Sequence, residues 1–393
     1  MKVRVLNKAH YTIEILDETG GLKKDIVKFE PYKEKTIEVS GSSVFFRNVR
    51  SHKELKINQF NPQAYLKRND LILGKDFNFC YDSSAQHKGN AYIYAIEALS
   101  KPILEYLNNS EAGFLEKPAP GKDGKALNIR YFSSLRIAQQ GKVSVGPHDI
   151  FYSHGIGDKN YWIGNHIQSF KYAFVPGPAW EERMRNTGYK GEIFQVGYTK
   201  LDPIFEIRSK LKNNIENANK INVLWLPTHG YCGKNKGRSS YPGFVKFLEY
   251  LDPTFNFIHS KHPTSKQNDK KKQLPTLDEY LNKNMVVIAD GGSTIYEAWA
   301  LGIPVVFPDW ICKRDIINHF KKDKNNFEYM IYSKDIGYHA RSIKEMNKMI
   351  ETAVINGMKD EEKQFIEEIF PEELRGKSGK TAAQTLKNIK STL

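Results

Sequence analysis

The chain has 393 residues, of which 40% are hydrophobic and 12% aromatic, and 59 Lys and Arg against 45 Asp and Glu give a net charge of +14. This length predicts two domains, and three widely separated cysteines exclude a disulfide scaffold or a zinc site built on cysteine pairs. Because no stretch approaches a signal peptide's apolar core or the roughly 20 apolar residues of a membrane span, we expect a cytoplasmic protein, peripheral at the inner membrane face at most. The positive charge predicts attraction to polyanions, namely anionic lipid, an acidic polymer or nucleic acid.

Residues 1–48 are predicted to form a small β appendage. The segments VRVLN, TIEIL, DIVKF and KTIEV alternate or run apolar, and DETGG and SGSS are typical of turns. No helical pattern interrupts them.

From about residue 70, predicted strands alternate with predicted helices. KDFNFCY, DIFYS, YAFV and EIFQVGY are strand-like, and AYIYAIEALSKPILEYL and PAWEERMRNTGY are helix-like. A charged helical segment, FEIRSKLKNNIENANK, leads to a second series, with strands INVLWLP, FNFIHS and MVVIA and helices PGFVKFLEYL and EAWALG. The tail from about residue 342 is helical and polar.

This alternation predicts an α/β fold with two doubly wound Rossmann-type domains facing across a cleft. We expect an N-terminal acceptor-side domain at 49–210, a C-terminal nucleotide-donor domain at 211–345 and C-terminal helices at 346–393.

The stretch VVIADGGSTIYEAWALGIPVVFP contains a turn between a buried strand and a helix. The turn consists of Asp290, Gly291, Gly292, Ser293 and Thr294. Glycines let the backbone approach a ligand closely, and Ser293 is predicted to cap the helix, whose N–H groups and positive dipole end would face a phosphate. Glu297, one turn further on, is predicted to reach a ribose hydroxyl. The alternative is an ordinary strand-to-helix turn with a serine cap.

The loop YSHGIGDKNYW follows the predicted strand DIFYS and carries His154. Ligands of open α/β sheets bind beyond the carboxyl ends of the strands, and imidazole titrates near neutrality, so His154 is a candidate general base. Lys159, five residues on, can meet negative charge. The alternative is a histidine that only hydrogen-bonds its own loop.

Two more polar loops follow strands of the second series. HSKHPTSK contains Lys261 and His262, which could grip a pyrophosphate or form a basic surface loop. LPTHGYCGKNKGRSS contains Thr228 and Arg238 among glycines whose spacing matches no Walker loop. Acid-any-acid and zinc-ligand spacings are missing from the sequence, so we expect no metal and no cofactor.

The order of these motifs resembles the CDP-glycerol glycerophosphotransferase family, the teichoic acid and capsule polymerases with a GT-B fold. His154, Gly155 and Lys159 match its His-Gly loop with a lysine five residues after the histidine. Residues 197–202, GYTKLD, are similar to its Gly-Tyr-Pro-x-x-Asp element, with Thr199 in place of proline.

Three further elements in the second series carry the resemblance, which covers roughly residues 145–312. They are Pro227 with Thr228 for Pro-Thr, Lys261 to Pro263 for Lys-x-His-Pro, and Asp290 with Ser293 and Thr294 for Asp-x-Ser-Ser. Two features depart from the family. His229 stands where it often has arginine, and the DGGST turn with Glu297 is closer to GT-B glycosyltransferases and sugar 2-epimerases.

The resemblance implies a transferase that moves glycerol phosphate, or a related alditol phosphate, from a CDP-activated donor to a hydroxyl of a polyanionic cell-surface polymer or its lipid-linked primer. His154 would deprotonate the acceptor, and CMP would leave. The implied donor-side residues are Lys261, His262, Asp290, Gly291, Gly292, Ser293, Thr294, Glu297, Thr228 and Arg238, and the acceptor-side residues are Gly155 and Lys159.

The implied partners are the CDP-linked donor, the polyanionic or lipid-linked acceptor and an anionic membrane surface, with nucleic acid as a second candidate polyanion. Two alternatives stay open. One is a GT-B glycosyltransferase that uses a nucleotide-sugar on a polyanionic acceptor, and the other is a catalytically silent binding protein of the same fold.

Overall fold

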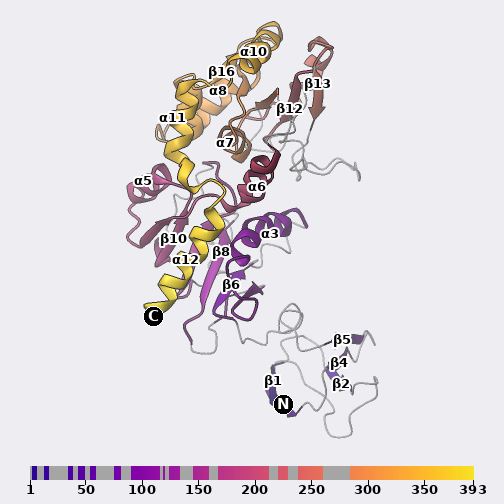
Figure 1. The fold of residues 1–393 in the computed structure, drawn as a ribbon, viewed down its shortest axis with the longest axis vertical. Helices are drawn as coiled ribbons and strands as arrows, with labels where there is room; N and C mark the ends of the chain where they lie inside the picture. Colours follow the sequence, from indigo (N-terminus) through magenta and orange to yellow (C-terminus); the bar gives the residue numbers. More distant parts are fainter. Residues whose placement is uncertain are drawn as a thin grey trace.

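The computed structural model describes the domains at residues 75–80, 90–115, 118–119, 124–132, 145–158, 167–211, 220–228, 238–259 and 284–393, with only the backbone at 90–95, 132, 210 and 211 (Figure 1). It also describes the backbone of five N-terminal strands. These are β1 (Lys2–Leu6), β2 (Ile13–Leu16), β3 (Glu34–Glu38), β4 (Ser43–Asn48) and β5 (Glu54–Asn58).

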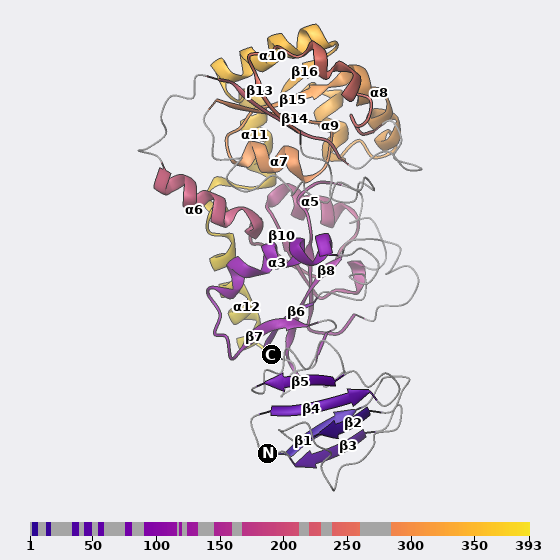
Figure 2. The same cartoon turned by 90° about the vertical axis from the view of Figure 1, so that its right-hand side faces the viewer.

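The N-terminal strands form two small antiparallel sheets, in which β1 pairs with β3, and β4 pairs with both β2 and β5. They lie at the opposite end of the molecule from the second domain (Figure 2). The β appendage therefore extends to Asn58, past the expected boundary at residue 48. The expected strand DIVKF lies outside the described residues.

The first domain contains a six-stranded sheet in the order β11-β10-β9-β8-β6-β7, with every pair parallel. Its strands are β6 (Phe77–Cys80), β7 (Ala112–Leu115), β8 (Leu127–Phe132), β9 (Asp149–Ser153), β10 (Tyr172–Val175) and β11 (Glu192–Gln195). The helices α3 (Asn90–Leu104), α5 (Pro178–Asn186) and α6 (Asp202–Leu211) accompany it.

The second domain contains a five-stranded parallel sheet in the order β13-β12-β14-β15-β16. Its strands are β12 (Asn222–Leu226), β13 (Asn256–His259), β14 (Met285–Ala289), β15 (Val305–Pro308) and β16 (Tyr338–Ala340). The chain reverses its direction of winding between β12 and β14, so the crevice where such sheets bind ligands lies at the carboxyl ends of these two strands.

Four helices accompany the second sheet, and a fifth returns to the first domain. They are α7 (Ser293–Ala300), α8 (Asp309–Phe320), α9 (Phe327–Ser333), α10 (Ile343–Asn356) and α12 (Ser378–Ser391). A further helix, α11 (Asp360–Ile369), packs against α5 and α7 and so touches both domains. Helix α12 crosses back and packs on α3, as Figures 1 and 2 both show.

One hydrophobic core continues from the first domain into the second. Trp180 of α5 packs edge-on against Phe327 of α9, with ring centroids 4.8 Å apart. Phe327 in turn packs against Phe365 of α11 at 6.0 Å. The two domains are thus joined along one side by buried aromatic side chains.

The α/β prediction is confirmed, with differences in single elements. The expected helix PGFVKFLEYL is only a 3-10 segment, η4 (Val245–Tyr250). In the two domains, strands β7, β8, β15 and β16 and helices α8 and α9 were not predicted. Strand β8, LNIRYF, carries buried Asn128 and Arg130, whose polar side chains break the apolar pattern but are paired with Asp149 in the interior.

Candidate functional site

The loop after β9 lies directly on the turn between β14 and α7. A Cβ atom on Gly157 would be 2.8 Å from the backbone carbon of Gly292 and the backbone nitrogen of Ser293. A Cβ on Gly155 would be 2.6 Å from Ser293 Oγ, and the Gly157 N–H donates to that Oγ at 3.3 Å. Glycines at these two positions therefore permit backbone from the first domain to touch the first turn of α7.

His154 lies at the start of this contact. Its side chain is half-buried, and it follows Ser153, the last residue of β9. The Ser153 hydroxyl donates to the Gly155 carbonyl at 2.7 Å and accepts from the Gly155 N–H at 3.3 Å. These two bonds hold the backbone on both sides of His154. The next residue, Gly155, already lies against Ser293 of the other domain.

The expected serine cap of α7 is wrong. The helix begins at Ser293, its N-cap is Gly292 with φ of 82°, and no side chain caps it. Positive φ is the conformation that glycine adopts at little cost, and the Gly292 N–H donates to Glu328 Oε1 at 2.8 Å. The hydroxyls of Ser293 and Thr294 are therefore not engaged in capping, and Thr294 Oγ1 is buried without a hydrogen-bond partner among the described residues.

Asp290 is buried beneath the turn. Its carboxylate accepts hydrogen bonds from the Thr228 N–H at 2.8 Å, from the Ser240 N–H and hydroxyl, and from the Ser239 hydroxyl at 3.4 Å. Burial raises the pKa of Asp290 to about 6, although these donors act in the opposite direction. Asp290 therefore links the turn to Thr228, which follows β12, and to Ser239 and Ser240, which precede η4.

Glu297 faces the other domain. Its carboxylate is 3% exposed, pairs with Lys200 Nζ at 2.7 Å and accepts from the Tyr198 hydroxyl at 3.3 Å. Both partners belong to the GYTKLD element of the first domain. Contact of Glu297 with a ribose stays a prediction, and it would compete with this pair.

The other expected site residues divide into two groups. Thr228 lies half-buried at the end of β12, and half-buried Arg238 has its guanidinium 5.8 Å from the Phe320 ring centroid. Both come near the turn, since Asp290 contacts Thr228 and the residues that follow Arg238. Lys159, Lys261 and His262 lie outside the described residues.

A buried ionic group that the sequence did not suggest supports the His154 loop. Asp158 is fully buried, and its carboxylate lies 2.5 Å from Arg183 Nε and accepts from the Phe327 N–H at 3.1 Å. The Asp158 carbonyl accepts from the Asn326 side chain at 3.0 Å. Burial alone would lower the pKa of Arg183, but hydrogen bonds and charge pairing with Asp323 and Asp158 raise it.

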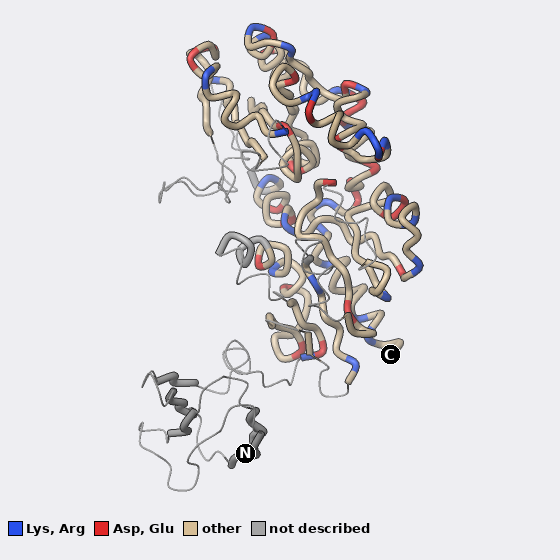
Figure 3. The backbone as a smooth tube through the Cα atoms, turned by 180° about the vertical axis from the view of Figure 1, so that it is seen from behind, with Lys and Arg blue, Asp and Glu red and all other residues tan. Residues whose placement is uncertain are grey.

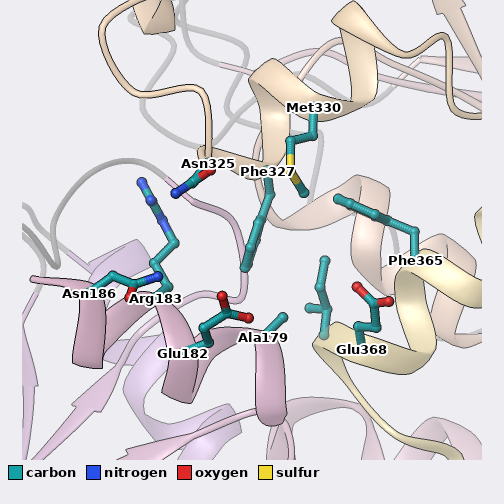
Figure 4. Close-up of a pocket in the computed structure, with 10 residues that line it drawn as sticks. Ala179, Glu182, Arg183, Asn186, Asn325, Phe327, Met330, Phe365 and Glu368 are labelled. Atoms are coloured by element: carbon teal, nitrogen blue, oxygen red, sulfur yellow. The ribbon is translucent and has the colours of Figure 1, made fainter.

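Next to this group, a shallow cavity of about 120 Å³ lies between α5, α9 and α11 (Figure 4). Phe327 and Phe365 form apolar walls, and Glu182 and Glu368 stand at its rim. Arg183, which also lines the cavity, already forms ion pairs with Asp158 and Asp323. The cavity lies between helices of both domains and shares Arg183 and Phe327 with the Asp158 contacts.

Among the residues that the structure describes, one cluster brings three metal-ligand side chains together: Asp309, Asp335 and His339. Lys313 Nζ contacts both carboxylates, and His339 Nδ1 lies 2.8 Å from Asp309 Oδ1. An ammonium group therefore occupies the position that a cation would take.

Basic and acidic residues are interspersed along the described backbone (Figure 3). No helix among the described residues is long and apolar enough to cross a membrane.

The sequence matches no family model and no curated protein. Among solved structures, a substituted form of the wall teichoic acid polymerase TagF soaked with CDPG is similar, with a TM-score of 0.51 and 13% identity over 81% of this chain and 90% of that chain. TagF itself has a TM-score of 0.48 and 14% identity over 81% and 91%. The UDP-GlcNAc 2-epimerase of Methanocaldococcus jannaschii with UDP-GlcNAc and UDP has a TM-score of 0.45 and 16% identity over 74% of this chain and 96% of that chain. The fold is GT-B-like, as the sequence predicted, and at these identities the likeness concerns the fold alone.

Proposed function

We propose that this chain is a transferase that moves glycerol phosphate, or a related alditol phosphate, from a CDP-linked donor to a hydroxyl of a polyanionic polymer or its lipid-linked primer. The observation that carries the proposal is the contact of the His154 loop with the turn at Gly292 and Ser293. It brings a candidate base from one domain beside a candidate phosphate site in the other.

The turn suits a phosphate for two reasons. The first N–H groups of a helix are not used within the helix, and the positive end of the helix dipole lies there. In addition, Thr294 Oγ1 has no partner among the described residues, and an unpaired buried hydroxyl costs roughly 1–3 kcal/mol. A phosphate oxygen of the donor would supply the missing acceptor.

The proposed reaction is an in-line displacement at phosphorus. His154 takes the proton of the acceptor hydroxyl, and the oxygen attacks the phosphorus that carries the glycerol. The bond from that phosphorus to the bridging oxygen breaks, and CMP leaves with the electron pair. Donors at the first turn of α7 stabilise the charge on the phosphates, an electrostatic contribution that is commonly the largest in such transfers.

A donor panel tests the proposal. The purified chain is incubated with CDP-glycerol, CDP-ribitol and UDP-sugars, together with a polyanionic or lipid-linked acceptor, and the released nucleotide is identified. We expect CMP. Release of a nucleoside diphosphate would instead support a glycosyltransferase, and nucleotide binding without release would support a silent binding protein.

The polyanionic acceptor has a separate test. Association with an acidic polymer or anionic vesicles should weaken steeply from low to physiological salt, because exposed charges are screened over about 8–10 Å at those ionic strengths. The +14 charge of the chain is the reason for this expectation. Association that is insensitive to salt would contradict it.

A further inference from the structure

Helix α9 contacts both halves of the candidate site through adjacent residues. At its first residue, the Phe327 N–H donates to Asp158 of the His154 loop at 3.1 Å. At its second residue, Glu328 Oε1 accepts from the Gly292 N–H of the turn at 2.8 Å. One turn later, the Tyr332 hydroxyl donates to the Asp290 carbonyl at 2.9 Å.

We infer that Asp158 and Glu328 are positioning residues, which use the first turn of α9 to set the spacing between the His154 loop and the Gly292 turn. Neighbouring residues of a helix are held at a fixed separation, so two segments bound to them cannot shift independently. The roles of His154 and the turn rest on the proposed function, whereas the spacing itself can be measured without turnover.

Burial and charge make this contact rigid. Asp158 and Asn326 are fully buried, and Glu328 is 6% exposed. Asn326 also caps α9, since its side chain accepts from the Tyr329 N–H at 3.1 Å while its amide donates to the Asp158 carbonyl. Arg183 Nε contacts Asp158 Oδ2, the oxygen that also accepts from the Phe327 N–H, and Arg183 binds Asp323 through two nitrogens. A charge-assisted group of this kind has few alternative arrangements.

Hydrogen exchange of the full-length protein tests the inference. Glu328→Ala removes the acceptor of the Gly292 N–H, and Glu328→Gln keeps an acceptor at the same place. We expect Glu328→Ala to speed exchange roughly tenfold or more both in the turn, residues 290–294, and in the loop of the other domain, residues 153–158. Glu328→Gln should restore near wild-type exchange in both.

Asp158→Asn tests the other end of the same connection. It keeps the size of the side chain and one acceptor but removes the charge facing Arg183, and it should speed exchange at 290–294 as well as at 153–158. Asp149→Asn is the matched control, because Asp149 pairs with buried Arg130 at the opposite end of β9. It should leave 290–294 unchanged. The inference is overturned if exchange rises at 153–158 alone in Asp158→Asn, or at 290–294 alone in Glu328→Ala.

Kinetics add a readout that depends on the proposed function. With CDP-glycerol as donor, Asp158→Asn should lower kcat at least tenfold while leaving the donor KM within about twofold, because the turn opens more often but keeps its own hydrogen bonds to Thr228 and Glu328. A parallel loss in kcat and in active protein would indicate simple destabilisation and overturn the positioning role. Wild-type protein without transfer would refute the proposed function and leave the exchange experiment to decide the inference.

Discussion

The turn at Gly292 and the loop at His154 are held in different ways. The turn is fixed within its own domain, since Asp290 binds Thr228, Ser239 and Ser240, and Glu328 binds the Gly292 N–H. The loop is fixed both by its own domain, through the Ser153 hydroxyl and Arg183, and by the other domain, through the contacts of Asp158 and Gly157. The proposed donor site therefore depends on contacts within the second domain, whereas the proposed base, His154, lies in a loop that contacts both domains.

The largest expected effect separates chemistry from docking. His154→Ala should lower turnover roughly 10²–10⁴-fold, the usual contribution of a general base, with little change in donor affinity or in the free energy of unfolding. Single-turnover rates, calorimetric titration of CDP and CMP, and urea unfolding measure the three quantities. Near-normal transfer by the folded variant would remove His154 from the mechanism.

A pair of glycine substitutions probes the contact between loop and turn. In Gly157→Ala the new Cβ meets backbone atoms of the turn at 2.8 Å, so the loop must move, and a displacement of about 1 Å can cost on the order of 10²-fold in rate. In Gly155→Ala the new Cβ meets only Ser293 Oγ, which can rotate, so the loss should be much smaller. Equal rates for the two variants would show that the contact does not position His154.

The pH dependence of stability reports on the support of the turn. Burial raises the pKa of Asp290 from 3.8 to about 6, so folding favours the protonated form. This contribution is fully present below about pH 4 and is lost as the pH rises through 6, a change of about 3 kcal/mol in the free energy of unfolding. Asp290→Asn should remove that part of the slope in urea unfolding between pH 4 and 6.

Among the described carboxyl groups, two others with a raised pKa titrate in or near the same region, so the comparison must be made between variants. Burial raises the pKa of Asp202 to about 6 and that of Glu362 to about 7. Both remain in Asp290→Asn, and their contributions cancel in the difference from wild type. An identical pH slope in the two proteins would contradict the assignment to Asp290.

The smallest expected effect concerns one hydroxyl of the turn. Ser293→Ala should weaken donor binding roughly tenfold, since a hydrogen bond to a charged group contributes about 1.5–3 kcal/mol. Its stability should fall only slightly, since the variant loses the 3.3 Å hydrogen bond from the Gly157 N–H but no cap of α7. Ser342→Ala is the opposite control, as the Ser342 hydroxyl does cap α10 and its loss should cost about 1 kcal/mol of stability without affecting the donor.

The sequence predicted the alternation of strands and helices because buried parallel strands are continuous apolar runs, as in MVVIA and NVLWL. It also placed His154 and the Asp290 turn at strand ends, which follows from the topology of open sheets. It misassigned the cap of α7, since Gly292 and Ser293 are both acceptable there and only the backbone angle distinguishes them.

Side-chain pairs between residues that are far apart in the chain could not be predicted from the sequence. Glu297 pairs with Lys200, 97 residues away in the other domain, and no sequence pattern indicates that pair. Asp158 lies between His154 and Lys159 in the sequence, but its contacts are with Arg183 and Phe327, which are far away along the chain. Glu328 had no distinguishing pattern around it. Such residues are identified by docking between domains, which local periodicity does not encode.

The return of α12 to the first domain has a consequence for biosynthesis. The face of α3 that α12 covers emerges from the ribosome about 270 residues before its cover, a delay of roughly 15–60 s at common translation rates. Asp202 accepts from the Ser378 and Gly379 N–H groups, so its hydrogen bonds also form only after α12 has been synthesised. Released chains that end before Ser378 should therefore remain protease-sensitive in the first domain and recruit holdase chaperones there, while the released 393-residue chain should not.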